Sequence, residues 1–215
     1  FNIYGCVLLI VPEWKPVGNA ATYNNDTGVM LITAAGRRNG PSCVDSKIHH
    51  CNLINNILPK IQANLAGAAD ALMLDDHGYI SETNATNIFM VKDGVVSTPT
   101  ADYCLPGVTR NTIIDMVNAM PAHMKIPPCR VRNISLAEIY AADEVFTTGS
   151  MGELTPVIEI DGRAIGYLYT DKDAFEAVRV AESAGQIDKS SPWPFTSLLQ
   201  HMYRGLTDTE GLPIP

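Results

Sequence analysis

Three short turns built on Asp and Gly divide the chain into brief apolar runs and restrict its possible folds. The turns are Asp76-His77-Gly78, Asp93-Gly94 and Asp161-Gly162. Such sequences favour the backbone angles of β-hairpins, in which neighbouring strands run antiparallel. A doubly wound parallel sheet instead alternates strands with helices. The chain is therefore predicted to be a mixed α/β (α+β) protein with several hairpins.

Hydrophobic periodicity places the other elements, because apolar residues cluster in short runs or recur at helical spacing. Predicted strands cover residues 3–11, 29–34, 71–74, 79–81, 87–91, 95–97, 129–132, 144–148, 155–160 and 163–165. Predicted helices cover residues 51–66, 109–117, 136–141, 171–184 and 195–205. The first helix has an apolar stripe that we expect to be buried. It contains Pro59, which should kink it, and Gly67 ends it.

Charge and hydropathy argue against two classes of partner. The 215 residues carry 15 basic and 23 acidic side chains, a formal net charge of −8, so no nucleic-acid partner is predicted. The basic pairs Arg37-Arg38 and Arg130/Arg132 are predicted to be solvated surface. The longest apolar run, Tyr4 to Pro12, has strand length and falls short of the ~18 residues of a membrane span, so no membrane partner is predicted.

The cysteines and histidines do not form a metal pattern. Five cysteines, an odd number, include no CxxC pair, which disfavours both a zinc site and a disulfide scaffold and fits a reducing compartment. His49 and His50 are adjacent, so on a helix they would point about 100° apart. No third ligand is evident beside them, and no metal site is predicted.

Two loops have the character of phosphate sites. The stretch CLPGVTRNTII, residues 104–114, leads into a helix whose first N–H groups and dipole favour an anion, with the Thr109 hydroxyl beside them. The loop TTGSMGE, residues 147–153, follows a strand and offers small residues and hydroxyls. Taken singly, the first is more simply an ordinary capped helix and the second a tight polar turn. Neither is a Walker or Rossmann fingerprint, which favours a phosphorylated cofactor other than a nucleotide.

Two side chains could carry the chemistry. Lys47 precedes the helix expected to be buried, where desolvation would favour a neutral, nucleophilic amine, although a lysine at a helix start is ordinarily a surface residue. Glu82 is the single acid of the polar hexad 81–86. A nucleophilic lysine, a phosphate site and a buried acid are the three groups that pyridoxal phosphate requires.

Four segments, in this order, resemble the class IV aminotransferases. These fold-type IV enzymes use pyridoxal phosphate and include branched-chain aminotransferase, D-amino acid aminotransferase and aminodeoxychorismate lyase. The segments are DSKIHHCNLINNIL, ALMLDDHGYISETNATNIFMVKDGVV, YCLPGVTRNTI and ADEVFTTGSMGELTPV, and they cover most of residues 29–165. The resemblance implies that Lys47 forms the Schiff base with pyridoxal 5'-phosphate and transfers the proton. It implies that Glu82 pairs with the pyridine nitrogen.

The resemblance also assigns the neighbouring residues. Thr83, Asn84 and Asn87 would orient Glu82 and help to satisfy the turn, and Leu105 would pack against the ring of the cofactor. The groups expected to bind the phosphate are Val108, Thr109 and Ser150, and those expected on the substrate carboxylate side are Ser150 and Met151. Position 52 is Asn, where several relatives carry a tyrosine near the cofactor's hydroxyl.

The implied fold is the large C-terminal domain of the D-amino acid aminotransferase-like fold. Residues 1–12 would be the last strand of a small N-terminal domain that is mostly absent and that supplies a phosphate-binding arginine. Residues 13–28 would form an interdomain linker and residues 29–215 the large domain, with an insertion near 167–192.

The implied activity is transamination between a branched-chain or D-amino acid and a 2-oxo acid. Aminodeoxychorismate lyase chemistry, which releases pyruvate, and a truncated, inactive homologue are the alternatives. When complete, the protein is expected to be a soluble homodimer in the cytoplasm or an organelle.

Overall fold

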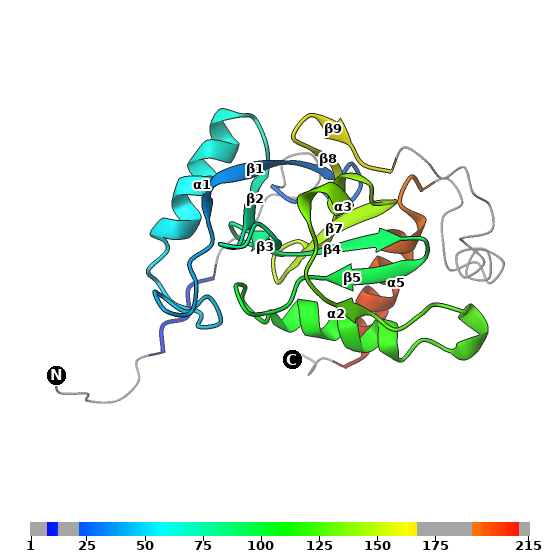
Figure 1. Ribbon diagram of the computed structural model, residues 1–215. Helices are drawn as coiled ribbons and strands as arrows, with labels where there is room; N and C mark the ends of the chain where they lie inside the picture. Colours follow the sequence, from blue (N-terminus) through cyan, green and yellow to red (C-terminus); the bar gives the residue numbers. More distant parts are fainter. Residues whose placement is uncertain (1–7, 13–21, 167–190, 211–215) are drawn as a thin grey trace.

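A mixed sheet organises the chain in the computed structural model, which describes residues 8–12, 22–166 and 191–210 (Figure 1). Within these residues the sheet has nine strands in the order β3-β2-β1-β8-β7-β4-β5-β6, and β9 pairs with β8. The strands are β1 (Val29–Arg37), β2 (Asp70–Leu74), β3 (Ile80–Thr83), β4 (Asn87–Lys92), β5 (Val95–Thr98), β6 (Arg130–Val131), β7 (Glu144–Gly149), β8 (Glu153–Ile160) and β9 (Arg163–Ala164). The helices are α1 (Ile54–Leu65), α2 (Val108–Asn118), α3 (Leu136–Tyr140) and α5 (Pro194–Thr209), with a 3-10 turn, η2, at Ala122–Met124.

Strand directions confirm the predicted mixed class. β1 runs parallel to β2 and to β8, and β5 runs parallel to β6, whereas the other pairs are antiparallel. The hairpins β4/β5 and β8/β9 turn at Asp93-Gly94 and Asp161-Gly162, where all four residues have positive φ. The turn at 76–78 joins the antiparallel strands β2 and β3. All three turns predicted from the sequence are therefore present.

The sheet buries both of its faces. Alternate residues of a strand point to opposite sides, so Phe89 and Val91 of β4 pack with α2 and α5, whereas Ile88 and Met90 pack on the side of α3. Phe89 stacks on Phe146 of β7 with ring centroids 5.0 Å apart. Both faces of β4 are thus covered by apolar packing, and the strand begins at a polar residue, Asn87.

Helix α1 is present as predicted but faces the other way. It contains Pro59 and is followed by Gly67 at φ +73°. Its buried residues are Pro59 and Ala63, and Ala63 packs against small residues of β1 and β2, which allow the helix to approach the sheet closely. The apolar stripe is solvent-exposed, with fractions between 45% and 86% for Leu53, Ile54, Ile57, Leu58, Ile61 and Leu65. The prediction that this stripe is buried was wrong.

The chain ends agree only in part with the sequence prediction. Residues 8–12 contain no strand and Leu8 to Val11 are exposed, so the predicted strand 3–11 is absent from its described part. Residues 3–7, the first part of the predicted linker and the helix predicted at 171–184 lie outside the described residues. Helix α5 confirms the helix predicted at 195–205. No helix in the described part of the chain has the length and apolar character needed to cross a membrane.

Candidate functional site

A cavity of about 310 Å³ lies between the start of α1 and the end of β3. Glu82 and Leu105, which were both predicted to belong to the site, line it. The other lining residues are Arg38, Ser46, Ile48, His49, His50, Leu53, Asn56, Ile57, Asn84 and Ala85. Volumes of this order accommodate a small organic ligand.

Glu82 is the buried acid of this cavity. Its Oε2 accepts hydrogen bonds from the Asn87 Nδ2 and from the Leu105 N–H, both at 3.2 Å. Its Oε1 accepts from Arg38 Nε at 2.9 Å. Burial raises the pKa of Glu82 to about 7, while Arg38, the Leu105 N–H and the more distant Arg110 pull that pKa down. A carboxyl with such a pKa can hold a negative charge beside a protonated partner at neutral pH.

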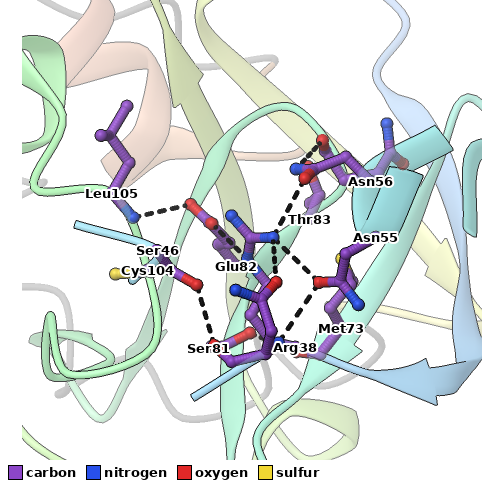
Figure 2. Close-up of polar contacts among 12 residues, drawn as sticks. Arg38, Ser46, Asn55, Asn56, Met73, Ser81, Glu82, Thr83, Cys104 and Leu105 are labelled. Carbon is purple, nitrogen blue, oxygen red and sulfur yellow. Dashed lines mark hydrogen bonds and ion pairs between the residues drawn. The ribbon is translucent and has the colours of Figure 1, made fainter. Parts of the chain in front are cut away.

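Arg38 is the site residue that the sequence analysis missed. Arg37 is exposed, as predicted, but Arg38 is buried and forms an ion pair with Glu82 whose two side chains are 7% and 6% exposed (Figure 2). The pair Arg37-Arg38 ends a strand, and consecutive strand residues point to opposite sides. That alternation was the available signal that the two arginines could not both be solvated.

The polar residues around Glu82 make hydrogen bonds to two different acids, Glu82 itself and Asp70. Asn87 orients Glu82, as predicted, but Thr83 and Asn84 do not. The Thr83 hydroxyl and the Asn84 Nδ2 donate to the buried carboxylate of Asp70, at 3.2 and 3.1 Å. The prediction that these two residues orient Glu82 was therefore wrong, because Asp70, a second buried acid, competes for them. The prediction that they help to satisfy the turn is confirmed for Thr83, whose hydroxyl accepts hydrogen bonds from the N–H groups of Ala85 and Thr86.

Lys47 lies at the edge of the cavity. It follows Ser46 and precedes Ile48, which both line the cavity, but its own side chain is 44% exposed and its Nζ lies 3.9 Å from a carboxylate oxygen of Asp102. Lys47 is thus not desolvated, and of the two interpretations left open the structure favours the surface lysine. The residue sits seven positions ahead of α1, in a loop rather than at the start of a buried helix.

The two predicted phosphate loops meet around Asn87. Its Nδ2 donates to the Leu105 carbonyl at 2.8 Å, and its backbone is registered opposite Thr148 at the end of β7. Helix α2 begins at Val108 behind Gly107, which offers no side-chain cap, so the first N–H groups of the helix have no such acceptor. The hydroxyl of Thr148 is buried and has no hydrogen-bond partner among the described residues.

The four residues predicted on these loops differ in exposure. Thr109 is buried, whereas Val108, Ser150 and Met151 are exposed. None of the four lines the cavity of Glu82. The structure thus brings the two loops to one end of the sheet, beside Asn87.

Known proteins are similar to this chain in sequence. Residues 9–160 match the family described as amino-transferase class IV. Branched-chain-amino-acid aminotransferase-like protein 1 of Arabidopsis thaliana is 49% identical over 215 residues, which are 100% of this chain and 33% of that protein. The branched-chain-amino-acid aminotransferase of Pseudomonas aeruginosa is 42% identical over 129 residues, 55% of this chain and 40% of that enzyme.

Solved structures give the same result. The branched-chain aminotransferase of Thermoproteus uzoniensis, solved with norvaline, matches 91% of this chain and 57% of its own at a TM-score of 0.65 and 28% identity. The T.th. enzyme complexed with N-(5'-phosphopyridoxyl)-L-glutamate matches 74% of this chain and 53% of its own, at a TM-score of 0.61 and 33% identity. The chain thus spans about a third of the length of its Arabidopsis relatives and about half of these enzymes. With its fold, its motifs and residues 9–160 all in agreement, the chain belongs to the class IV amino-transferase family.

Proposed function

We propose that this chain is the pyridoxal-phosphate-binding part of a transaminase that moves an amino group between a branched-chain amino acid and a 2-oxo acid. The observation that carries the proposal is the buried carboxylate of Glu82 in the wall of a small cavity, held by Asn87, around which the two loops predicted to bind phosphate meet. The relatives named above supply the substrate class. Because the chain spans only part of their length, the activity is proposed for the complete protein.

The residues present fit this cofactor. Glu82, with a pKa near 7, suits a pyridine nitrogen, which is protonated in the ring's electron-accepting form. Leu105 lines the same cavity and offers an apolar contact for the ring. The N–H groups of Val108 and Thr109 at the start of α2, with Ser150 on the neighbouring loop, would hold the phosphate. The buried, unpartnered hydroxyl of Thr148 is further polar capacity at this end of the sheet.

The chain's own residues then divide the chemistry. Bound pyridoxal phosphate supplies an aldehyde that takes up the amino group and a ring that accepts electrons from the substrate's Cα–H bond. Glu82 holds the proton of the ring nitrogen in place. Lys47 Nζ would take the proton from the substrate's Cα as a general base and, as a general acid, would deliver it to the carbon that carried the aldehyde. Backbone N–H groups at Ser150 and Met151 would bind the substrate carboxylate.

Cofactor binding is the first test. The purified chain is incubated with pyridoxal phosphate, reduced with borohydride, digested and mapped by mass spectrometry. We expect near-visible absorbance before reduction and a covalent label on Lys47. A colourless protein, or label on Lys60 or Lys92, would overturn the assignment and favour an inactive, cofactor-free homologue.

Amino transfer is the second test. With the complete protein, L-leucine should convert an added 2-oxo acid to its amino acid, and D-alanine should serve poorly. Pyruvate released from aminodeoxychorismate without any acceptor would instead identify a lyase. Transfer from D-alanine at a rate equal to that from L-leucine would contradict the branched-chain assignment.

A further inference from the structure

The guanidinium of Arg38 is held by hydrogen bonds from two of its nitrogens, Nε and Nη1. Its Nε donates to Glu82 Oε1 at 2.9 Å. Its Nη1 lies 3.0 Å from Oδ1 of Asn55 and 3.0 Å from Oδ1 of Asn56, the second and third residues of α1 (Figure 2). A side chain with Nε and Nη1 committed in this way is not available to bind a phosphate through them. It therefore acts on Glu82.

The two asparagines are themselves anchored. Asn55 Nδ2 donates to the Arg37 carbonyl at 2.9 Å, which ties the start of α1 to the end of β1. Asn56 Nδ2 donates to the Asn84 carbonyl at 2.8 Å, which ties it to the turn after β3. Both amides therefore present their oxygens to Arg38, and their orientation is set by backbone rather than by solvent.

Few charged groups face Glu82. Arg38 comes from the end of β1, Arg110 from α2, and the Cys104 thiol from the loop before α2. Arg110 donates to the Pro99 carbonyl and to Asn111. Burial raises the pKa of Cys104 to about 12, so this thiol is neutral at pH 7. Arg38 is thus the only charged side chain among the described residues in direct contact with the Glu82 carboxylate.

We propose that Arg38 is a positioning residue that favours the ionised form of Glu82 and aims its carboxylate, and that Asn55 and Asn56 hold Arg38 in that role. The pairing of Glu82 with a pyridine ring rests on the proposed function above. The effect of Arg38 on the protonation of Glu82 does not rest on it, and this effect can be measured without any cofactor. The first turn of α1, directly after the Lys47 loop, would in this way influence the pKa of Glu82 on β3.

A carboxyl titration tests this directly. The cofactor-free chain is labelled with ¹³C at the glutamate carboxyl, and the Glu82 resonance is assigned by its loss in Glu82→Gln. We expect Arg38→Met to raise the midpoint of Glu82 by about one to three pH units, because an opposite charge in contact is removed. The matched control, Arg132→Met, removes an arginine paired with Glu138 in a half-exposed position and should leave the midpoint of Glu82 unchanged.

Two further variants separate positioning from charge. Arg38→Lys keeps the charge but lacks the planar fork that reaches Glu82 and both amides together, so its midpoint should lie between those of the wild type and Arg38→Met. The double variant Asn55→Ala/Asn56→Ala should also raise the midpoint. An unchanged midpoint in Arg38→Met overturns the proposal. Wild-type midpoints in both Arg38→Lys and the double variant overturn the positioning role, and these variants serve if Arg38→Met does not fold.

Cofactor affinity gives the last readout. In Arg38→Met, pyridoxal phosphate measured by absorbance at pH 7 should bind about five- to five-hundredfold more weakly. The reason is that a midpoint raised by one to three pH units lowers the ionised fraction of Glu82 from about one half to between about one tenth and one thousandth. Affinity should recover above the new midpoint, where the carboxyl is ionised again. A loss that is equal at every pH would show a merely structural role. Failure of the wild type to bind the cofactor, with the midpoint shift intact, would sink the proposed function and leave the role of Arg38 standing.

Discussion

Glu144 and Thr196 are joined twice, because one carboxylate oxygen accepts both the backbone N–H of Thr196 at 2.7 Å and its hydroxyl at 2.6 Å. The other oxygen accepts the Phe195 N–H at 2.8 Å. A buried acid on β7 thus caps α5 from outside the helix, at the end where the helix dipole is positive. Its three hydrogen bonds add to the apolar packing that holds α5, the last helix of the described chain, against the sheet.

Glu144→Gln should lower the free energy of unfolding by about 3 kcal/mol, because a charge-assisted cap is replaced by an amide whose NH₂ faces other donors. Urea denaturation followed by circular dichroism measures the loss. Glu153→Gln is the control, since Glu153 pairs with Arg204 on the surface at 3.4 Å and such pairs contribute at most about 1 kcal/mol. Equal losses in the two variants would refute the cap.

The stability of the cofactor-free chain should fall as the pH rises. Burial raises the pKa of Glu82 from 4.5 to about 7, so the native state keeps a proton that the unfolded state releases between these values. The contribution is complete below pH 4.5, declines as the pH rises toward 7 and amounts to about 3 kcal/mol. Glu82→Gln should remove this part of the slope, which lies between about pH 4.5 and 7, in urea titrations. A slope unchanged by the substitution would contradict the raised pKa.

Lys47→Ala should separate chemistry from stability. The side chain is exposed and its contact with Asp102 is long, so the free energy of unfolding should change by less than about 0.5 kcal/mol. Covalent capture of pyridoxal phosphate by borohydride should nevertheless disappear. Lys92→Ala, which removes another exposed lysine paired with an acid, should retain capture. Retained capture in Lys47→Ala would exclude it as the nucleophile.

Gly107→Ala should disturb the site through Asn87. A Cβ at Gly107 would overlap the Asn87 Oδ1, and the Asn87 amide holds both Glu82 and the Leu105 carbonyl. The backbone of Gly107, at φ −61°, suits alanine, so the cost is steric, about 1–3 kcal/mol. Thermal unfolding and cofactor titration should both report a loss.

Gly205→Ala is the matched control for Gly107→Ala. Gly205 lies in α5, and no described atom lies within 4 Å of the position that an added methyl group would take. Alanine is the better helix former by about 0.5–1 kcal/mol. This variant should raise the melting temperature and leave cofactor affinity unchanged. A loss of affinity in Gly205→Ala would mean that Gly107→Ala reports general damage.

Local sequence patterns predicted where the helices and strands lie better than they predicted which surfaces and side chains contact one another. Turn residues and apolar spacing located the hairpins and α1, because both signals are encoded within a few residues. Which side of α1 meets the sheet depends on Ala63 and Ala71, which belong to different elements, and the larger apolar residues outweighed them in the prediction. Arg38 and Asp70 escaped notice for the same reason, since Glu82 lies 44 residues from Arg38 and the partners of Asp70 lie 10 or more residues away.

The motifs predicted which residues gather at the site but not how their side chains are held. Glu82, Leu105 and Asn87 are close together, as expected. The acceptors of Thr83 and Asn84, and the exposure of Lys47, depend on packing between segments that no local pattern describes.

Two residues at the start of α1, Leu53 and Ile57, belong both to the cavity wall and to the exposed apolar stripe. A surface that covered this stripe would therefore alter the walls that a ligand in the cavity meets. Any change in ligand affinity that such contact produced would be matched by an equal factor in the affinity of the contact itself, because the two equilibria form a closed thermodynamic cycle. The outer face of this helix is thus a point at which assembly and ligand occupancy become one coupled equilibrium.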